Sequence, residues 1–247
     1  MRCDVITLFP ELIRSALGES ILKRAQANAL LDIQIHQLRD FAVDKHHTTD
    51  DVPYGGGGGM LLKPEPIFAA VEKVKSLRDG AVRIIIPSPQ GKIFNQKMAE
   101  NFSQDKRTLV FICGHYEGID ARVAQGIEIE EVSLGDYILT GGELPAVTMI
   151  DAAARLLPGV LGGATSALHE SFEDSLLEHP HYTRPYEFRG MQVPEVLLSG
   201  NHGAIRDWRR AHAIINTQER RPDLLTEAVL SPDEKQGLPL GPCLMEE

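Results

Sequence analysis

Three glycine-containing stretches each follow an apolar run that is typical of a buried strand. They are 87–91 (PSPQG), 113–120 (CGHYEGID) and 134–145 (LGDYILTGGELP). Glycines directly after a strand let the backbone turn sharply and approach a ligand closely, and open α/β sheets bind ligands at the loops that follow their strands. Three such loops that converge would surround a small molecule with backbone donors and acceptors. The spacing therefore predicts a small-molecule site at one edge of a sheet.

An alternation of strand-like and helix-like patterns positions these loops. We expect strands over 3–9, 31–37, 82–86, 108–112 and 127–133, and helices over 20–28 (with Ser20 as N-cap), 64–77, 95–102 and 144–157. This alternation favours an α/β fold, a parallel sheet with helices on both faces. The predicted domains are an α/β domain over 1–158 that carries the small-molecule site, a flexible Gly/Ala-rich linker over 159–175 and a helical C-terminal domain over 176–247. Helices in that last domain are expected over 194–198, 202–216 and 221–229.

The composition narrows the class of protein. At 247 residues with 43% hydrophobic residues the chain can bury a sizeable core, while its apolar runs are too short to span a membrane. No signal-peptide pattern opens the sequence, so we expect a cytoplasmic protein. Three cysteines without pair spacing suggest neither a disulfide framework nor a cysteine metal site. The formal net charge of −10 argues against indiscriminate binding to polyanions.

A local basic cluster departs from this acidic balance. Five arginines lie between positions 206 and 221 around Trp208, and they are Arg206, Arg209, Arg210, Arg220 and Arg221. Such a stretch is either a solvated helix face or a surface for nucleic acid.

The glycine run over 55–59 lacks the strand and helix of a dinucleotide-binding loop. It is therefore interpreted as a tight flexible loop or as a loop that faces a substrate. The histidines at 46–47 and at 179 and 181 lack metal-ligand spacing and are expected at the surface.

A series of longer motifs occurs in a fixed order along almost the whole chain. They are ITLFP (6–10), RDF (39–41), TDD (49–51), PYGGG (53–57), SPQG (88–91), YEGID (116–120), GDYILTGGELP (135–145), PHYTRP (180–185) and LLSGNH (197–202). In these motifs the chain closely resembles the bacterial tRNA (guanine-N1)-methyltransferases of the SPOUT superfamily. Enzymes of that family methylate the guanosine immediately 3′ of the anticodon.

The resemblance implies features that spacing alone does not reveal. It implies a deep trefoil knot, S-adenosylmethionine as methyl donor, a homodimer, and magnesium bound by acidic residues. His46 and Asp50 match residues that contact the target guanosine, while Arg209 and Arg210 would contact the tRNA anticodon stem-loop. Twelve residues match positions around the cofactor: Ser88, Pro89, Gly114, Tyr116, Glu117, Leu134, Gly135, Tyr137, Leu139, Gly141, Gly142 and Pro145.

The chemistry of the implied reaction asks for a base and a cation. Guanine N1 carries a proton at neutral pH, so its methylation needs a group that takes this proton and a donor that stabilises negative charge on O6. Arg155 matches the family's guanine-orienting arginine, although by position alone it is an ordinary helix-end cation. The family base is an aspartate directly before Ser-Phe, and Glu170 stands in that place here. We expect Glu170 to be the base, with Glu173 and Asp174 as alternatives.

Two other functions remain open at the level of sequence. A knotted methyltransferase that acts on ribose 2′-hydroxyls would share the cofactor loops without needing a base at Glu170. A non-enzymatic anticodon-binding protein would lack methyl transfer altogether.

Overall fold

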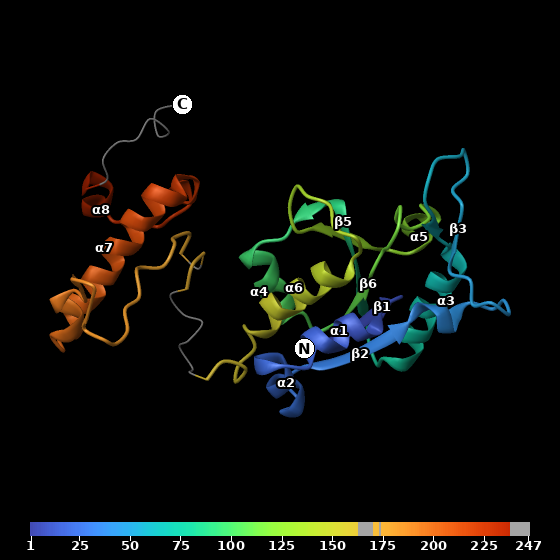
Figure 1. Cartoon of the computed structure of the whole chain (residues 1–247), viewed down its shortest axis with the longest axis horizontal. Helices are drawn as coiled ribbons and strands as arrows, with labels where there is room; N and C mark the ends of the chain where they lie inside the picture. The colour runs from blue at the N-terminus through green and yellow to red at the C-terminus, as the bar shows by residue number, and fades with distance from the viewer. Residues whose placement is uncertain (163–169, 173, 238–247) are drawn as a thin grey trace. The chain divides into compact units, whose positions relative to one another are not determined.

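The chain forms two compact units, Met1–Ala164 and Thr165–Glu247. The computed structural model describes residues 1–162, 170–172 and 174–237. In Figure 1 the first unit runs from blue to yellow and contains β1 to α6, and the second runs from orange to red and contains β8 to α8. The boundary between the units falls inside the expected linker over 159–175, of which 163–169 and 173 lie outside the described residues.

A five-stranded parallel sheet is the centre of the first unit. Its strand order is β2 (Asp32–Gln37), β1 (Arg2–Thr7), β6 (Thr108–Ile112), β5 (Val82–Ile93) and β7 (Glu130–Ser133). Every neighbouring pair in this sheet is parallel. The expectation of an α/β fold with a parallel sheet is therefore confirmed.

Helices cover both faces of this sheet. In the central strand β6, Leu109 and Phe111 face one core while Val110 and Ile112 face the other, because successive side chains of a strand point to opposite faces. The first core is completed by α1 (Pro10–Leu17), α2 (Ser20–Ala27), α4 (Gln96–Gln104) and α6 (Glu143–Ala154). The second core is completed by α3 (Pro64–Leu77), α5 (Arg122–Gly126) and the 3₁₀ helix η1 (Leu38–Phe41).

Several element boundaries differ from the sequence-based expectation. Strand β5 continues to Ile93 instead of ending at Ile86, and its pairing with β7 shifts register between Pro87 and Lys92. Since both of these residues pair with Val132, the segment between them is a bulge in the strand rather than a separate loop. Ser20 is not the N-cap of α2, because the helix begins at Ser20 and Glu19 precedes it without a side-chain cap. The sequence analysis also missed α1, α5 and the hairpin of β3 (Asp50–Asp51) and β4 (Leu61–Leu62).

The second unit is built on α7 (His202–Arg220). The Asn201 side chain accepts a hydrogen bond of 3.2 Å from the Ala204 amide and so caps the start of this helix. The helices expected over 194–198 and 221–229 are instead the short 3₁₀ helices η2 (Glu195–Leu198) and η3 (Pro222–Thr226). The unit also holds α8 (Pro232–Gly237) and the hairpin of β8 (Glu187–Phe188) and β9 (Met191–Gln192). In the described part of the chain, no helix is both long and apolar enough to cross a membrane.

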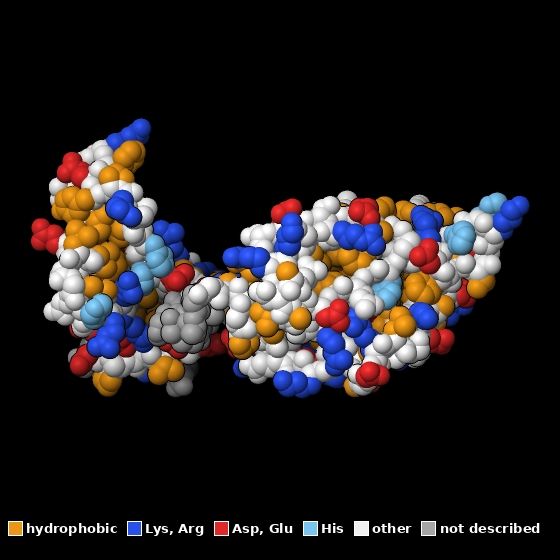
Figure 2. All heavy atoms as spheres, turned by 90° about the horizontal axis from the view of Figure 1, so that it is seen from below, with side chains coloured by type: hydrophobic (Ala, Val, Ile, Leu, Met, Phe, Trp, Pro, Cys, Tyr) orange, Lys and Arg blue, Asp and Glu red, His pale blue; other side chains and the backbone are white. Residues whose placement is uncertain are grey.

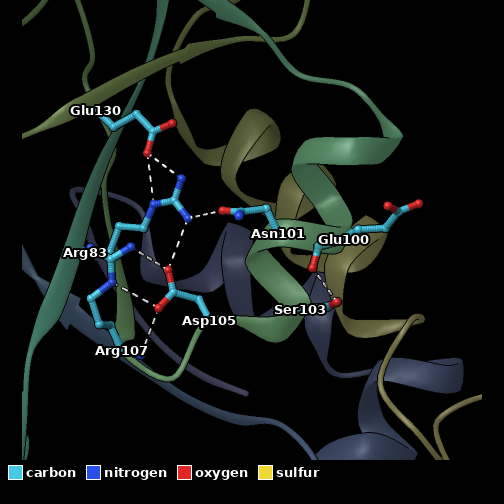
Figure 3. Close-up of polar contacts among 7 residues, drawn as sticks. All are labelled: Arg83, Glu100, Asn101, Ser103, Asp105, Arg107 and Glu130. Atoms are coloured by element: carbon cyan, nitrogen blue, oxygen red, sulfur yellow. Dashed lines mark hydrogen bonds and ion pairs between the residues drawn. The ribbon is translucent and has the colours of Figure 1, made fainter.

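An ionic network ties together the amino-terminal ends of β5, β6 and β7 (Figure 3). The Arg83 guanidinium donates to Glu130 at 2.6 and 2.9 Å, to Asn101 at 2.6 Å and to Asp105 at 3.1 Å. Arg107 donates to the same Asp105 carboxylate at 2.7 Å. Because the strands are parallel, this network leaves their carboxyl ends at the opposite edge for the glycine-containing loops.

The network makes stability depend on acid pH. Hydrogen bonds from Arg107 lower the pKa of Asp105 from 3.8 to about 2, so its stabilising effect is complete above pH 4 and is lost as the pH falls towards 2. We expect Asp105→Asn to remove about 1–2 kcal/mol from the free energy of unfolding at pH 6 and to flatten its pH dependence between pH 4 and 2.5. Urea unfolding across this range measures both effects. An unchanged slope in Asp105→Asn, with exposed Asp79→Asn as control, would contradict this account.

Candidate functional site

A pocket of about 540 Å³ is lined by the bulged part of β5 and by the glycine-containing segments that follow β6 and β7. Its volume falls in the range of small-molecule sites. The structure brings together all twelve residues that the sequence analysis assigned to the cofactor. The pocket wall includes Ser88, Pro89, Gly114, Tyr116, Glu117, Leu134, Gly135, Tyr137, Leu139, Gly141, Gly142 and Pro145.

The segment after β6 forms a tight turn at the pocket. The Gly118 amide donates to the His115 carbonyl at 3.0 Å, and Tyr116 takes a left-handed conformation with φ of 59°. A non-glycine residue in this region is strained and needs support from its surroundings. That support comes from the chain that leads into β4, since Glu117 donates to the Met60 carbonyl at 3.0 Å and Leu62 donates to the Gly118 carbonyl at 3.0 Å.

The start of α6 lies directly against the end of β6. The Gly142 amide donates to the Gly114 carbonyl at 2.8 Å. A Cβ atom added to Gly142 would lie 2.9 Å from the Cys113 Cα and 3.1 Å from the Gly114 nitrogen, both backbone atoms. A Cβ added to Gly141 would overlap the Glu143 carboxylate and lie 2.6 Å from His115 Nδ1. Gly142 is thus required by contacts with the backbone, whereas a side chain at position 141 would have to displace the side chains of Glu143 and His115.

One buried polar group, Glu143, lies behind this wall, and another, the Nδ1 atom of His115, belongs to a residue of the wall. Glu143 is 3% exposed, and its carboxylate accepts a hydrogen bond of 2.6 Å from the Thr7 hydroxyl. His115 Nδ1 is buried and has no hydrogen-bond partner among the described residues. A buried nitrogen of this kind is satisfied by a water molecule or a polar ligand. Both groups escaped the sequence analysis, although His115 and Glu143 stand inside the quoted motifs.

The buried cysteine next to the pocket wall, Cys113, is not a nucleophile at neutral pH. Burial raises the pKa of the Cys113 thiol well above its usual value, and the neighbouring Glu143 charge raises it further. The thiolate is the reactive form, so this side chain stays a small apolar group of the core.

The residues expected to contact guanosine lie on the neighbouring segment. Asp50 in β3 pairs with Leu62 in β4, and Leu62 in turn bridges to Ile119 of the pocket wall. His46 is exposed on the loop before β3. The glycine run over 55–59 follows β3, and added side chains at 55–58 would meet open space. The geometry thus brings Asp50 and the glycine run next to the pocket segment that carries Glu117.

The two expected catalytic residues belong to different units. Arg155 is the C-cap of α6 and is half-buried. Glu170 is half-buried in the second unit, and close to it in the chain the Phe172 amide donates to the Leu176 carbonyl at 2.8 Å. The alternative base Glu173 lies outside the described residues, and Asp174 lies 3.9 Å from the Arg210 guanidinium.

The structure divides the arginine cluster into two kinds of residue. Arg210 donates to Glu234 at 2.8 Å and to the Val229 carbonyl at 2.7 Å, so it joins α7 to the segment that leads into α8. Its hydrogen bond to Glu234 lowers the pKa of that carboxyl to about 2. Arg206 and Arg209 are exposed on α7. Sequence could not separate them, because the partner of Arg210 lies 24 residues away.

Metal ligands are not gathered at this site. Among residues 1–162, 170–172 and 174–237, no group of three or more His, Cys, Asp or Glu side chains could hold a metal ion. The magnesium implied by the family resemblance therefore does not fit a ready-made cluster of these side chains.

Comparison with known proteins agrees with the motifs. A family described as tRNA (Guanine-1)-methyltransferase TrmD matches residues 1–227. A protein of Desulforamulus reducens named tRNA (guanine-N(1)-)-methyltransferase is 52% identical over 239 residues, which cover 96% of this chain and 94% of the relative. Relatives of the same name include proteins from Carboxydothermus hydrogenoformans (55% identity, 95% of this chain and 91% of the relative) and Latilactobacillus sakei (51% identity, 96% of each).

Proposed function

Because this chain belongs to the tRNA (guanine-N1)-methyltransferase family, we propose that it transfers a methyl group from S-adenosylmethionine to the guanosine immediately 3′ of the tRNA anticodon. Methyl transfer to N1 of a tRNA guanine is its activity as a family member. The finer proposal is carried by one observation: the wall of one pocket contains all twelve residues that match the family's cofactor positions.

The pocket fits S-adenosylmethionine by its chemistry. It combines apolar side chains such as Ile86, Leu134 and Ile138 with backbone groups of the glycine-containing segments. The unpartnered His115 Nδ1 is a polar group that a bound molecule or its water could satisfy. When bound, this cofactor supplies an electrophilic methyl group on a positively charged sulfur. Leu134 to Leu139 and Gly114 to Glu117 would hold and orient it.

Two side chains are proposed to handle the guanine. Glu170 takes the N1 proton, and Arg155 donates to O6 and so stabilises the negative charge that spreads there as the proton leaves. His46 and Asp50 position the guanosine. No step of this mechanism requires magnesium, for which the resemblance remains the sole support.

A homodimer and a trefoil knot complete the proposal. Exposed apolar side chains stand in and next to the pocket wall. Ile138 of the wall is 80% exposed, and Leu144, which precedes the wall residue Pro145, is 50% exposed. Such a patch is typical of an interface. The segment between β7 and α6 leaves the edge strand and returns to the end of β6, two strands away. This return path supports a knotted chain. The tRNA substrate favours a cytoplasmic location.

Arg206 and Arg209 are proposed to contact phosphates of the anticodon stem-loop. Replacing both by alanine should weaken tRNA binding and reduce the salt slope of log K by roughly one unit per arginine that contacts a phosphate, with the affinity for S-adenosylmethionine unchanged. Filter binding between 50 and 200 mM salt measures this slope.

Arg210→Ala is the matched variant, because it removes the ion pair with Glu234. We expect it to lower the melting temperature of the second unit more than the Arg206/Arg209 variant does. If the Arg206/Arg209 variant keeps the parental salt slope, these arginines do not contact phosphates and belong to a solvated helix face.

The proposed target is tested with two transcripts. A tRNA transcript with guanosine after the anticodon should accept methyl groups from labelled S-adenosylmethionine, whereas its adenosine variant should accept almost none. Equal labelling of the two transcripts would refute the proposed position.

A further inference from the structure

Five aromatic rings of the second unit form one connected group, which we call the ring cluster. Its members are His179, His181, Tyr182, Trp208 and His212. The Trp208 and His212 rings stack at 3.9 Å between centroids. Trp208 is also 6.1 Å from the His179 ring and 6.3 Å from the Tyr182 ring, and the His179 ring lies 4.5 Å from His181.

Hydrogen bonds hold the two halves of the ring cluster together. The segment before His179 is attached to α7, because Leu177 donates to Thr217 at 2.8 Å and Asn216 donates to the Glu178 carbonyl at 2.7 Å. On α7 itself, His212 Nδ1 lies 2.9 Å from the Trp208 carbonyl oxygen. The segment that leads into His179 is therefore attached to α7 within the second unit itself.

The ring cluster has a supported side and an open side. Trp208, His179 and His212 are half-buried, whereas the Tyr182 residue is 49% exposed and the His181 side chain is 65% exposed. The rings of Tyr182 and His181 are thus open to solvent, while the half-buried rings of the cluster support them.

Positive charge accompanies these rings. Arg206 and Arg209 flank Trp208 on α7 and are exposed, and Arg184 is exposed two residues after Tyr182. On this unit, Figure 2 shows histidine side chains gathered among lysine and arginine side chains. Aromatic rings beside arginines bind unpaired nucleotides, because every base has a face that stacks and every phosphate a charge that arginine neutralises. In a paired stem the base faces are stacked inside the helix, so a site for paired RNA would need only arginines that contact phosphates.

We propose that the ring cluster is a binding site for an unpaired base of the tRNA, which stacks on Tyr182 and His181. This inference rests on the proposed function, since it takes tRNA as the substrate. It adds a contact that depends on base stacking to the phosphate contacts of Arg206 and Arg209. It also assigns a role to histidines that lack metal-ligand spacing and, in the described residues, form no group able to hold a metal.

Intrinsic fluorescence reports on this site directly, because Trp208 is the only tryptophan in the chain. We expect the full-length protein to lose tryptophan fluorescence when titrated with a hairpin that contains the anticodon stem and its loop. The same stem as a blunt duplex, without unpaired nucleotides, should bind more weakly and leave the fluorescence nearly unchanged.

Substitutions separate stacking from charge. Tyr182→Ala should weaken hairpin binding by about tenfold, as expected for the loss of one stacked base, and should leave the salt slope unaltered. Tyr182→Phe keeps the ring and should restore the parental affinity. Tyr186→Ala is the matched control, because Tyr186 is 44% exposed in the same unit and lies outside the ring cluster.

The outcomes distinguish this inference from the proposed function. Two results would overturn the proposed base-binding role of the ring cluster, and methyl transfer could persist in both cases. In the first, the hairpin binds in a filter assay but leaves the tryptophan fluorescence unchanged. In the second, the Tyr182→Ala variant binds the hairpin with parental affinity. A Tyr182→Ala variant with altered mass in light scattering would assign the cluster to a second copy of the chain, and this also overturns the inference. Absence of methyl transfer in the parental protein would instead contradict the proposed function.

Discussion

Glu170→Gln is expected to reduce methyl transfer by roughly 10²–10⁴-fold, the usual contribution of a positioned general base. The amide is nearly the same size as the carboxylate but cannot take the N1 proton. Binding of S-adenosylmethionine and of tRNA should change little, because Glu170 lies outside the pocket wall and on a different unit. Single-turnover kinetics with labelled cofactor measure the chemical step, and calorimetry measures the binding of the cofactor.

Glu170→Asp is the informative companion. It keeps the carboxylate but shortens its reach by about one carbon–carbon bond, and a misplacement of this size can cost on the order of 10²-fold in a rigid site. We expect Glu170→Asp to retain more activity than Glu170→Gln, because aspartate occupies this place in the family. Full activity in Glu170→Gln would exclude Glu170 as the base. Asp174→Asn and Glu173→Gln would then be tested.

Gly142→Ala is expected to weaken S-adenosylmethionine binding by roughly 10–100-fold, as the start of α6 is pushed away from β6 and its wall hydrogen bonds are lost. The added Cβ would lie 2.9 Å from the Cys113 Cα, and the three nearest atoms all belong to the backbone of Cys113 and Gly114, so no flexible side chain can move aside. The hydrogen bond from Gly142 to Gly114 must lengthen as a result. Calorimetric titration gives the affinity, and circular dichroism reports whether the variant is folded.

Gly162→Ala provides the matched control. Gly162 lies outside the pocket wall, and an added Cβ there would have no atom of its surroundings within 4 Å. It should bind the cofactor as the parental protein does. A folded Gly142→Ala variant with parental affinity would remove the junction of β6 and α6 from the cofactor site.

The periodic parts of the fold could be predicted from the sequence. β6 is buried at all five positions, and α3 begins with Pro64 and ends at Leu77 as expected. Local pattern alone determines such elements. The extension of β5 to Ile93 could not be predicted, because Pro87 and Gly91 suggest a loop while the pairing of Lys92 and Ile93 with β7 depends on distant residues.

The candidate site was predictable where it depends on glycine-containing segments after strands. The supporting contacts were not, since Glu143 finds Thr7 across 136 positions and Arg210 finds Glu234 across 24. The ring cluster likewise depends on a pairing of His179 and Tyr182 with Trp208 that no local spacing encodes. Long-range contacts of this kind decide which arginines and histidines remain exposed to solvent.

Mapping the methylated nucleoside tests the central claim most directly. After incubation of the protein with labelled S-adenosylmethionine and an unmodified tRNA, nuclease digestion and mass spectrometry identify the labelled nucleoside and its position. The account predicts that the label is in 1-methylguanosine from the nucleotide immediately 3′ of the anticodon. Label in a 2′-O-methylated ribose, label at another position, or an unlabelled tRNA that still binds the protein would contradict it.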